Sequence, residues 1–180
     1  PSIKAVAKLL IERDLISEDL AIFAAKASQG HIGVARYLAT DKQVRDDRLT
    51  TLKIPLMITD ISSAYKAAQL LVDTAKARAE ADAEVRDSGE IEKLKQAWGS
   101  TGSKLAAGGA KAVKELEKEQ KTRSTRLVRD YLDRALLDLA TLYRDVMLVQ
   151  SGVSESLINS DLKTEITNMA SSITESKTLL

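Results

Sequence analysis

The chain has 180 residues, a net charge of +1 and no cysteine. The balanced charge excludes a global field that would draw the chain to nucleic acid or a membrane, and the absence of thiols excludes disulfides, cysteine nucleophiles and cysteine-zinc sites. Hydrophobic residues make up 44% of the sequence, which is enough to bury a core, whereas only 3% are aromatic and only two are proline. This composition disfavours a β-sandwich and favours a helical protein.

Targeting signals are not evident in the sequence. It has no signal peptide, and no apolar run approaches the roughly 20 residues that span a bilayer. We therefore expect a cytoplasmic protein that does not associate with membranes. Because the sequence begins at Pro1 without an initiator methionine, we also expect it to be a fragment.

The first 41 residues are expected to form three short helices. The first spans about residues 3–13, the second follows Ser17 as N-cap and stops before Gly30, and the third begins near Ile32. The residues expected to face inward are Val6, Leu9, Leu10, Leu20, Phe23, Ala24, Ala27, Ala35 and Leu38. Residues 1–41 are therefore assigned to a small three-helix domain.

Residues 42–58 are predicted to link this bundle to a second domain. The stretch up to Leu52 is rich in charge, which indicates an exposed helix, and Pro55 should break or kink it. We place the domain boundary here, between Asp41 and Asp60, and assign residues 59–180 to a second, elongated helical domain.

The second domain is predicted to begin with a helix from residue 61 to about residue 87, capped by Thr59 or Asp60. Its apolar stripe consists of Ile61, Tyr65, Ala68, Val72, Ala75 and Ala79. Gly89 is expected to interrupt the helix, residues 91–98 to form a short helix and residues 99–110 to form a flexible loop. The alternating charges from about residue 73 to residue 125 suit a helical region that projects into solvent.

A long helix from about Lys111 to Gly152 is the centre of the predicted second domain. After residue 125 its apolar positions recur at intervals of three and four, and they are Val128, Leu132, Ala135, Leu139, Leu142, Val146 and Val149, widened by Leu136, Tyr143 and Met147. A last helix follows Ser160, with Leu162, Ile166, Met169 and Ile173 inward. With no credible strand anywhere, the sequence predicts an all-α fold.

The back of the long helix carries a second seam. Leu137 and Leu148 project there, with Thr141 and Arg144 between them. This mixture of apolar and polar side chains is compatible with burial by another helix of the same chain or with a subunit interface. The sequence does not distinguish burial within the chain from a subunit interface, and these four residues are the candidates for such an interface.

The segment from Gly30 to Arg36, GHIGVAR, is the most specific short motif. Gly30 can adopt a positive φ after a helix end, Gly33 permits a close helix approach, and Arg36 presents a planar cation suited to phosphate. The simpler interpretation is a helix-ending glycine followed by an ordinary surface arginine. His31, the only histidine, has no cysteine or second histidine with which to bind a metal, so we expect a surface residue at a helix start.

Two further patterns have simple explanations. The stretch from Gly99 to Lys104 resembles a phosphate loop but fails its spacing and follows a helix, so we expect a linker. The basic run on the long helix could touch the DNA backbone, but the solvated face of a helix explains it as well, since no aromatic residues interleave. That run consists of Lys118, Lys121, Arg123, Arg126 and Arg129. We identify no catalytic residue and no metal site.

The run LDLATLYRDVMLVQSG resembles the collar-domain helix of bacterial DNA polymerase III clamp-loader subunits, in which an apolar helix ends in a Tyr-Arg-Asp segment. A three-helix bundle whose last helix opens with Gly-x-x-Gly-x-Ala-Arg similarly resembles the lid domain of AAA+ ATPases. The likeness covers nearly the whole chain and is greatest to delta-prime subunits of the actinobacterial type. It implies a lid, a linker helix and a collar.

The resemblance also implies a function. Arg36, with Gly30 and Gly33, would stand at the sensor-2 position, which in ATP-binding relatives meets the terminal phosphate of the nucleotide. The chain would be a non-catalytic part without cofactor, whose collar binds the gamma/tau and delta subunits in a pentameric ring and meets DNA and the sliding clamp only indirectly. The catalytic activity would belong to the parent complex, a DNA-directed DNA polymerase with an ATP-driven clamp loader.

Two alternatives accompany this interpretation. One is a fragment of a gamma/tau-type subunit, which is disfavoured because that subunit usually follows its lid glycine with Ser-x-Arg-Asp-Ala. The other is a cytoplasmic helical adaptor unrelated to replication, which would use the exposed region 73–129 as a docking arm. An enzyme is the weakest option, since no pair of catalytic groups stands at a recognisable spacing.

Overall fold

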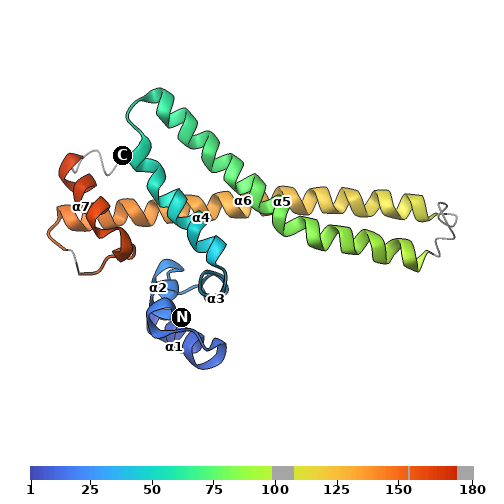
Figure 1. The fold of residues 1–180 in the computed structure, drawn as a ribbon, viewed down its shortest axis with the longest axis horizontal. Coiled ribbons are helices and arrows are strands. Elements are labelled where there is room, and N and C mark those ends of the chain that lie inside the picture. Colours follow the sequence, from blue (N-terminus) through green and yellow to red (C-terminus); the bar gives the residue numbers. More distant parts are fainter. Residues whose placement is uncertain (99–107, 154, 174–180) are drawn as a thin grey trace. The chain divides into compact units, whose positions relative to one another are not determined.

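The computed structural model describes residues 1–98, 108–153 and 155–173, and these residues form helices and connecting turns without any strand (Figure 1). The predicted all-α fold is therefore confirmed. The chain divides into two compact units, Pro1–Ala67 with Ala135–Leu180, and Ala68–Arg134. This grouping differs from the expected division at residues 42–58, because the linking helix contributes Leu52 to a core that also contains Leu142.

The first three helices are α1 (Ile3–Asp14), α2 (Glu18–Ala27) and α3 (Ile32–Thr40), close to the predicted spans. Leu15 and Gly30 adopt positive φ angles at the two turns, as helix ends require. The buried residues of this bundle are small except for three, and they are Val6, Ala7, Leu10, Ala21, Ala24, Ala25, Ala27, Ala35, Leu38 and Ala39. The abundance of alanine lets the short helices approach closely.

Helix α4 (Lys42–Lys53) is more buried than its charge suggested. Asp41 caps it by accepting a hydrogen bond from the Gln43 backbone at 2.8 Å, and Ile54–Met57 continue as the 3-10 helix η1, with Pro55 near its start. Arg48, Thr51 and Leu52 are buried along one side of α4. The expectation of a wholly exposed linking helix was wrong, because one arginine in the charged stretch has buried partners.

The second core of the first unit lies where α4 meets the end of α6 (Gly109–Gln150), the 3-10 helix η2 (Ser160–Leu162) and α7 (Lys163–Ser172). Its buried members are Leu52, Leu142, Val146, Leu162, Ile166 and Met169. The inward face of the last helix was predicted correctly. The apolar stripe predicted for the long helix was too wide, since Leu136 is 56% exposed and Leu139 is only half-buried.

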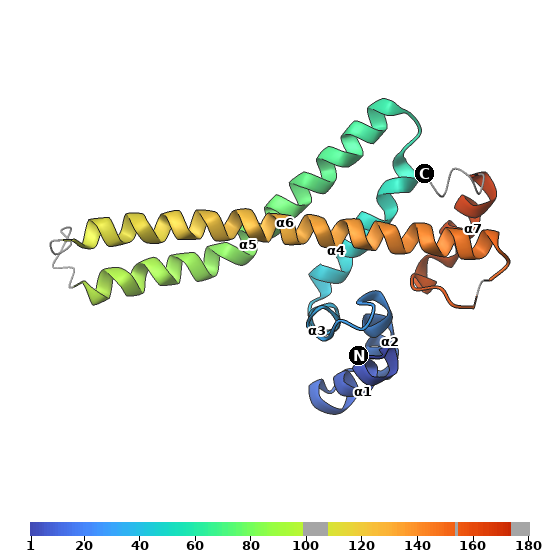
Figure 2. The ribbon, with the colours of Figure 1, turned by 180° about the vertical axis from the view of Figure 1, so that it is seen from behind.

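The second unit is an antiparallel hairpin of the later part of α5 (Ile61–Ala97) and the earlier part of α6, which lie side by side in both ribbon views (Figures 1 and 2). Ala75, Ala79 and Ala83 are buried at a spacing of four along α5. Trp98 lies against Gly108, where an added Cβ would be 3.2 Å from the indole ring. The loop predicted over residues 99–110 falls mostly outside the described residues.

Helix α5 runs without a break through Gly89, contrary to the predicted interruption. A glycine inside a helix costs only about 1 kcal/mol relative to alanine. Asp87 and Glu90, on either side of it, bond across the hairpin to α6, which offsets that cost. At the start of α5 the predicted cap is confirmed, since the Ser63 backbone donates to Asp60 Oδ1 at 2.8 Å and this bond lowers the pKa of Asp60.

Candidate functional site

The Gly30–Arg36 segment forms the turn into α3 and its first turns. An added Cβ at Gly30 would lie 2.5 Å from the Pro1 carbonyl oxygen, and φ is +83°, so this position requires glycine. At Gly33 an added Cβ would meet only the His31 ring, at 3.5 Å, which is ordinary contact. The close helix approach expected at Gly33 is therefore not present.

His31 caps α3, where its Nδ1 accepts a hydrogen bond from the Val34 backbone at 3.3 Å. This agrees with the prediction of a surface residue at a helix start. Among the described residues, no three His, Cys, Asp or Glu side chains gather as a metal site would require.

Arg36 is the only arginine of the Gly30–Arg36 segment, and its side chain is 56% exposed. One guanidinium nitrogen lies 3.1 Å from Oδ1 of Asp14, the last residue of α1. The Asp14 side chain is only 6% exposed, and its carboxylate also accepts hydrogen bonds from Arg13, so it pairs with two arginines. Arg36 is thus fixed in direction by Asp14 and still offers donors to an anion.

The Tyr-Arg-Asp segment at residues 143–145 has an internal role in this chain. Asp145 is fully buried, and its carboxylate accepts hydrogen bonds from the backbones of Ile158 and Asn159, at 3.1 and 2.7 Å, and from Asn159 Nδ2 at 2.9 Å. Arg144 donates to Asp145 at 2.8 Å. The aspartate therefore anchors the segment that follows α6.

A second buried charge, Arg48, was missed by the sequence analysis. It donates to Asp138 Oδ1 at 3.1 Å and to Asn159 Oδ1 at 2.5 Å, and its guanidinium lies 5.7 Å from the centre of the Phe23 ring. Asn159 continues the network to Thr141 at 3.2 Å. The buried network, as we call Arg48, Asp138, Thr141, Asp145 and Asn159, joins α4 to α6 and to the segment before α7.

The signal that could have revealed Arg48 is its spacing. Val44 stands four residues before Arg48, and Thr51 and Leu52 stand three and four residues after it, so the arginine occupies a position in an otherwise uncharged helical stripe. A charge at such a position needs a buried partner.

The four interface candidates on α6 do not share one environment. Leu137 is 54% exposed and Arg144 is exposed, Leu148 is half-buried, and Thr141 is buried in the network, where it donates to the Asp138 carbonyl. Thr141 is therefore excluded from an exposed seam. Leu137, together with Leu136, remains an exposed apolar pair.

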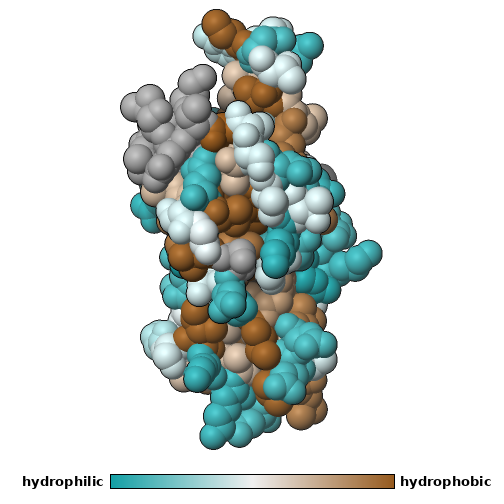
Figure 3. All heavy atoms as spheres, turned by 90° about the vertical axis from the view of Figure 1, so that its left-hand side faces the viewer, coloured by the Kyte–Doolittle hydropathy of each residue, from teal (hydrophilic) through white to brown (hydrophobic). Residues whose placement is uncertain are grey.

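A larger group of exposed apolar side chains extends from η1 to the start of α5. Its members, which we call the 56–65 surface, are Leu56, Met57, Ile58, Ile61 and Tyr65. Ile61 and Tyr65 are 78% and 75% exposed, although the sequence pattern assigned them to the apolar stripe of the helix. Figure 3 shows hydrophobic side chains in the open among hydrophilic ones on one face of the molecule. Neighbouring large apolar side chains that face solvent mark an interaction surface.

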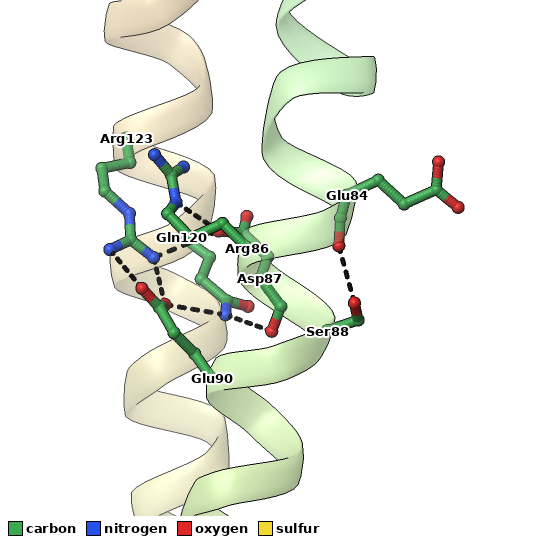
Figure 4. Close-up of polar contacts among 7 residues, drawn as sticks. All are labelled: Glu84, Arg86, Asp87, Ser88, Glu90, Gln120 and Arg123. Atoms are coloured by element: carbon green, nitrogen blue, oxygen red, sulfur yellow. Dashed lines mark hydrogen bonds and ion pairs between the residues drawn. The ribbon is translucent and has the colours of Figure 1, made fainter.

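In the hairpin, a polar cluster joins α5 to α6 (Figure 4). Arg123 bonds both Asp87 and Glu90, and Gln120 donates to the Asp87 carbonyl at 3.0 Å and to Glu90 at 3.3 Å. The hydrogen bond from Arg123 is the main reason why the pKa of Glu90 lies below its ordinary value of 4.5. Further along the hairpin, the Tyr131 hydroxyl bonds to Asp82.

Comparison of the chain with protein-family models, with curated proteins and with solved structures finds no match in any of the three. No helix within the described ranges has both the length and the apolar character needed to cross a bilayer.

Proposed function

We propose that this chain is the non-catalytic C-terminal part of a delta-prime-type subunit of a bacterial clamp loader, which binds the gamma/tau and delta subunits in a pentameric ring during DNA replication. The observation that carries the proposal is the 56–65 surface, where two large side chains are at least three-quarters exposed. An apolar surface of this kind is typical of a chain that works in an assembly.

Two features of the first unit support the same proposal. The bundle α1–α3 ends in a helix that presents Arg36 to solvent, as a lid domain would present a sensor-2 arginine. The exposed Leu136 and Leu137 on α6 offer a second apolar contact beside the Tyr-Arg-Asp segment. In the proposed ring, these leucines and the 56–65 surface face the neighbouring subunits, and DNA and the sliding clamp are met only through the complex.

The test is reconstitution with purified gamma/tau and delta subunits of an actinobacterial clamp loader, measured by size-exclusion chromatography with light scattering. We expect the chain to enter the complex, and the double variant Ile61→Asp/Tyr65→Asp to bind at least about tenfold more weakly, because each new charge would have to be buried. Leu15→Asp is the control. It adds one aspartate, half the charge of the double variant, at a leucine that is 87% exposed and in a left-handed position that aspartate tolerates.

Failure of the chain to bind either subunit would contradict the proposal. Arg36 has its own test in the assembled ring, where we expect Arg36→Ala to leave assembly intact and to alter only nucleotide-dependent steps. The chain alone should bind ATP no more tightly in its natural form than as Arg36→Ala, by calorimetry, since a single exposed arginine does not make a nucleotide site.

The second candidate is a helical adaptor that docks through its hairpin. It is favoured by one observation, namely that residues 68–134 form a compact unit of their own. Removal of the hairpin separates the two candidates. A clamp-loader subunit should still enter the ring through its first unit, whereas an adaptor should lose its partner.

A further inference from the structure

The outer side of α6 in the hairpin carries a row of cations, which we call the basic stripe: Lys111, Lys114, Lys118, Lys121 and Arg129. All five are exposed. With 3.6 residues per turn they fall within an arc about 80° wide and extend over about 27 Å of the helix. The glutamates of the same stretch lie on either side of this arc.

The basic stripe points away from the seam of the hairpin. Gln120 and Arg123 point from α6 toward α5, where they bond Asp87 and Glu90 (Figure 4). At about 100° per residue, both lie on the opposite side of α6 from the stripe. Within the described residues, the single ion pair of the stripe joins Lys111 to Glu115 at 3.9 Å, between largely exposed side chains. The charges are therefore available to a partner.

The composition of the arc restricts that partner. Its only other member among residues 111–129 is Thr125, so there is no apolar side chain to enter a membrane and no aromatic or leucine anchor for a protein interface, where lysine is depleted. There is also no aromatic side chain on which the unstacked bases of single-stranded DNA or RNA could stack. A row of cations without apolar contacts matches a regular row of phosphates.

We infer that the basic stripe binds the phosphate backbone of duplex DNA without reading its sequence. The inference stands on the hairpin alone and goes beyond the proposed function, in which DNA is met only indirectly. Five phosphate contacts predict that log K falls with log salt concentration with a slope of about −4 to −5, which corresponds to a loss of affinity of several hundredfold between about 50 and 200 mM salt.

The experiment measures fluorescence anisotropy of a labelled DNA duplex of about 20 base pairs with the full chain over that range of salt. We expect Lys114→Gln/Lys118→Gln/Lys121→Gln to reduce the magnitude of the slope by about 3, since three contacts are removed. The matched control, Lys8→Gln/Lys42→Gln/Lys53→Gln, changes the net charge equally at three exposed lysines of the first unit and should leave the slope unchanged. Circular dichroism verifies that both variants keep their helices.

Several results would overturn the inference. Equal effects of the two triple variants would mean that net charge alone determines binding, and absence of binding at about 50 mM salt would remove the activity itself. Tighter binding to the single strand, to duplex RNA or to anionic phosphatidylserine vesicles would assign the stripe to another partner. Because the proposed function assigns ring assembly to the first unit and not to the basic stripe, reconstitution with the clamp-loader subunits tests the proposed function separately.

Discussion

Two arginine–carboxylate pairs, one in each unit, join helices that are far apart in the sequence, and they differ in burial. Arg48 and Asp138 in the first unit have side chains that are 3% and 4% exposed, whereas Arg123 and Glu90 in the hairpin are 39% and 32% exposed. A buried charge depends on its partner, because removal of one member leaves the other uncompensated away from water. An exposed pair is screened by water and can be lost at small cost.

The two units also differ in the size of the apolar side chains that they bury. The first unit buries leucine, isoleucine and methionine side chains around Leu142, while the buried apolar side chains that the structure describes in the hairpin part of α5 are those of Ala75, Ala79 and Ala83. An alanine buries less apolar area than a leucine, and hydrophobic stabilisation is roughly proportional to the area buried. We therefore expect the first unit to depend on individual residues and the hairpin to depend on many weak contacts.

The largest effect should come from the buried network. Asp138→Ala leaves Arg48 buried without its carboxylate and should destabilise the first unit by about 3–5 kcal/mol, measured by urea unfolding. Asp133→Ala, at an exposed position of the same helix, is the control and should stay within about 0.5 kcal/mol. A destabilisation by Asp138→Ala as small as that of the control would mean that the Arg48–Asp138 pair, like an exposed pair, can be lost at small cost. The double variant Arg48→Met/Asp138→Leu should recover much of the loss, because no uncompensated charge remains.

The next effect tests the core around α6. Leu142→Ala should cost about 2–5 kcal/mol, because Leu142 is 1% exposed and its truncation leaves a cavity. Leu137→Ala removes the same atoms from a side chain that faces solvent and should cost less than about 0.5 kcal/mol. Thermal unfolding followed by circular dichroism separates the two. A larger loss for Leu137→Ala than for Leu142→Ala would mean that Leu137, and not Leu142, faces the core.

A smaller effect of the opposite sign is expected in the hairpin. Gly89→Ala should stabilise it by about 0.5–1 kcal/mol, because alanine suits a helix interior and nothing lies within 4 Å of the added Cβ. Amide hydrogen exchange of α5 residues near position 89 measures the change locally. Faster exchange in the variant would indicate that α5 is interrupted at Gly89 after all.

The smallest effect concerns pH. The pKa of Glu90 is lowered in the folded hairpin by its hydrogen bond from Arg123, so the unfolded state takes up a proton first as the pH falls. The resulting stabilisation is present above the ordinary value of 4.5 and is lost as the pH falls through the folded pKa. Melting of the hairpin helices between pH 6 and about pH 3 should therefore depend more on pH in the natural chain than in Glu90→Gln. Glu92→Gln, an exposed neighbour, is the control.

The sequence was most informative where the pattern is local. The ends of α1, α2 and α3 follow from Gly30, from the residue types at their turns and from apolar spacing, and the inward face of α7 follows from Leu162, Ile166 and Met169. It was least informative where a residue's environment depends on distant partners. Ile61 and Tyr65 satisfy a helical stripe and yet face solvent.

By itself, the sequence determined that this protein is helical and where most helices begin and end, because propensity, capping and periodicity act over a few neighbouring residues. Only the tertiary structure decided that Arg48 is buried against Asp138, 90 positions away, that Gly89 stays inside α5 and that the 56–65 surface is uncovered. The physical reason is that burial and pairing are properties of two elements together, and the cost of a charge, a glycine or an exposed side chain depends on what the other element supplies.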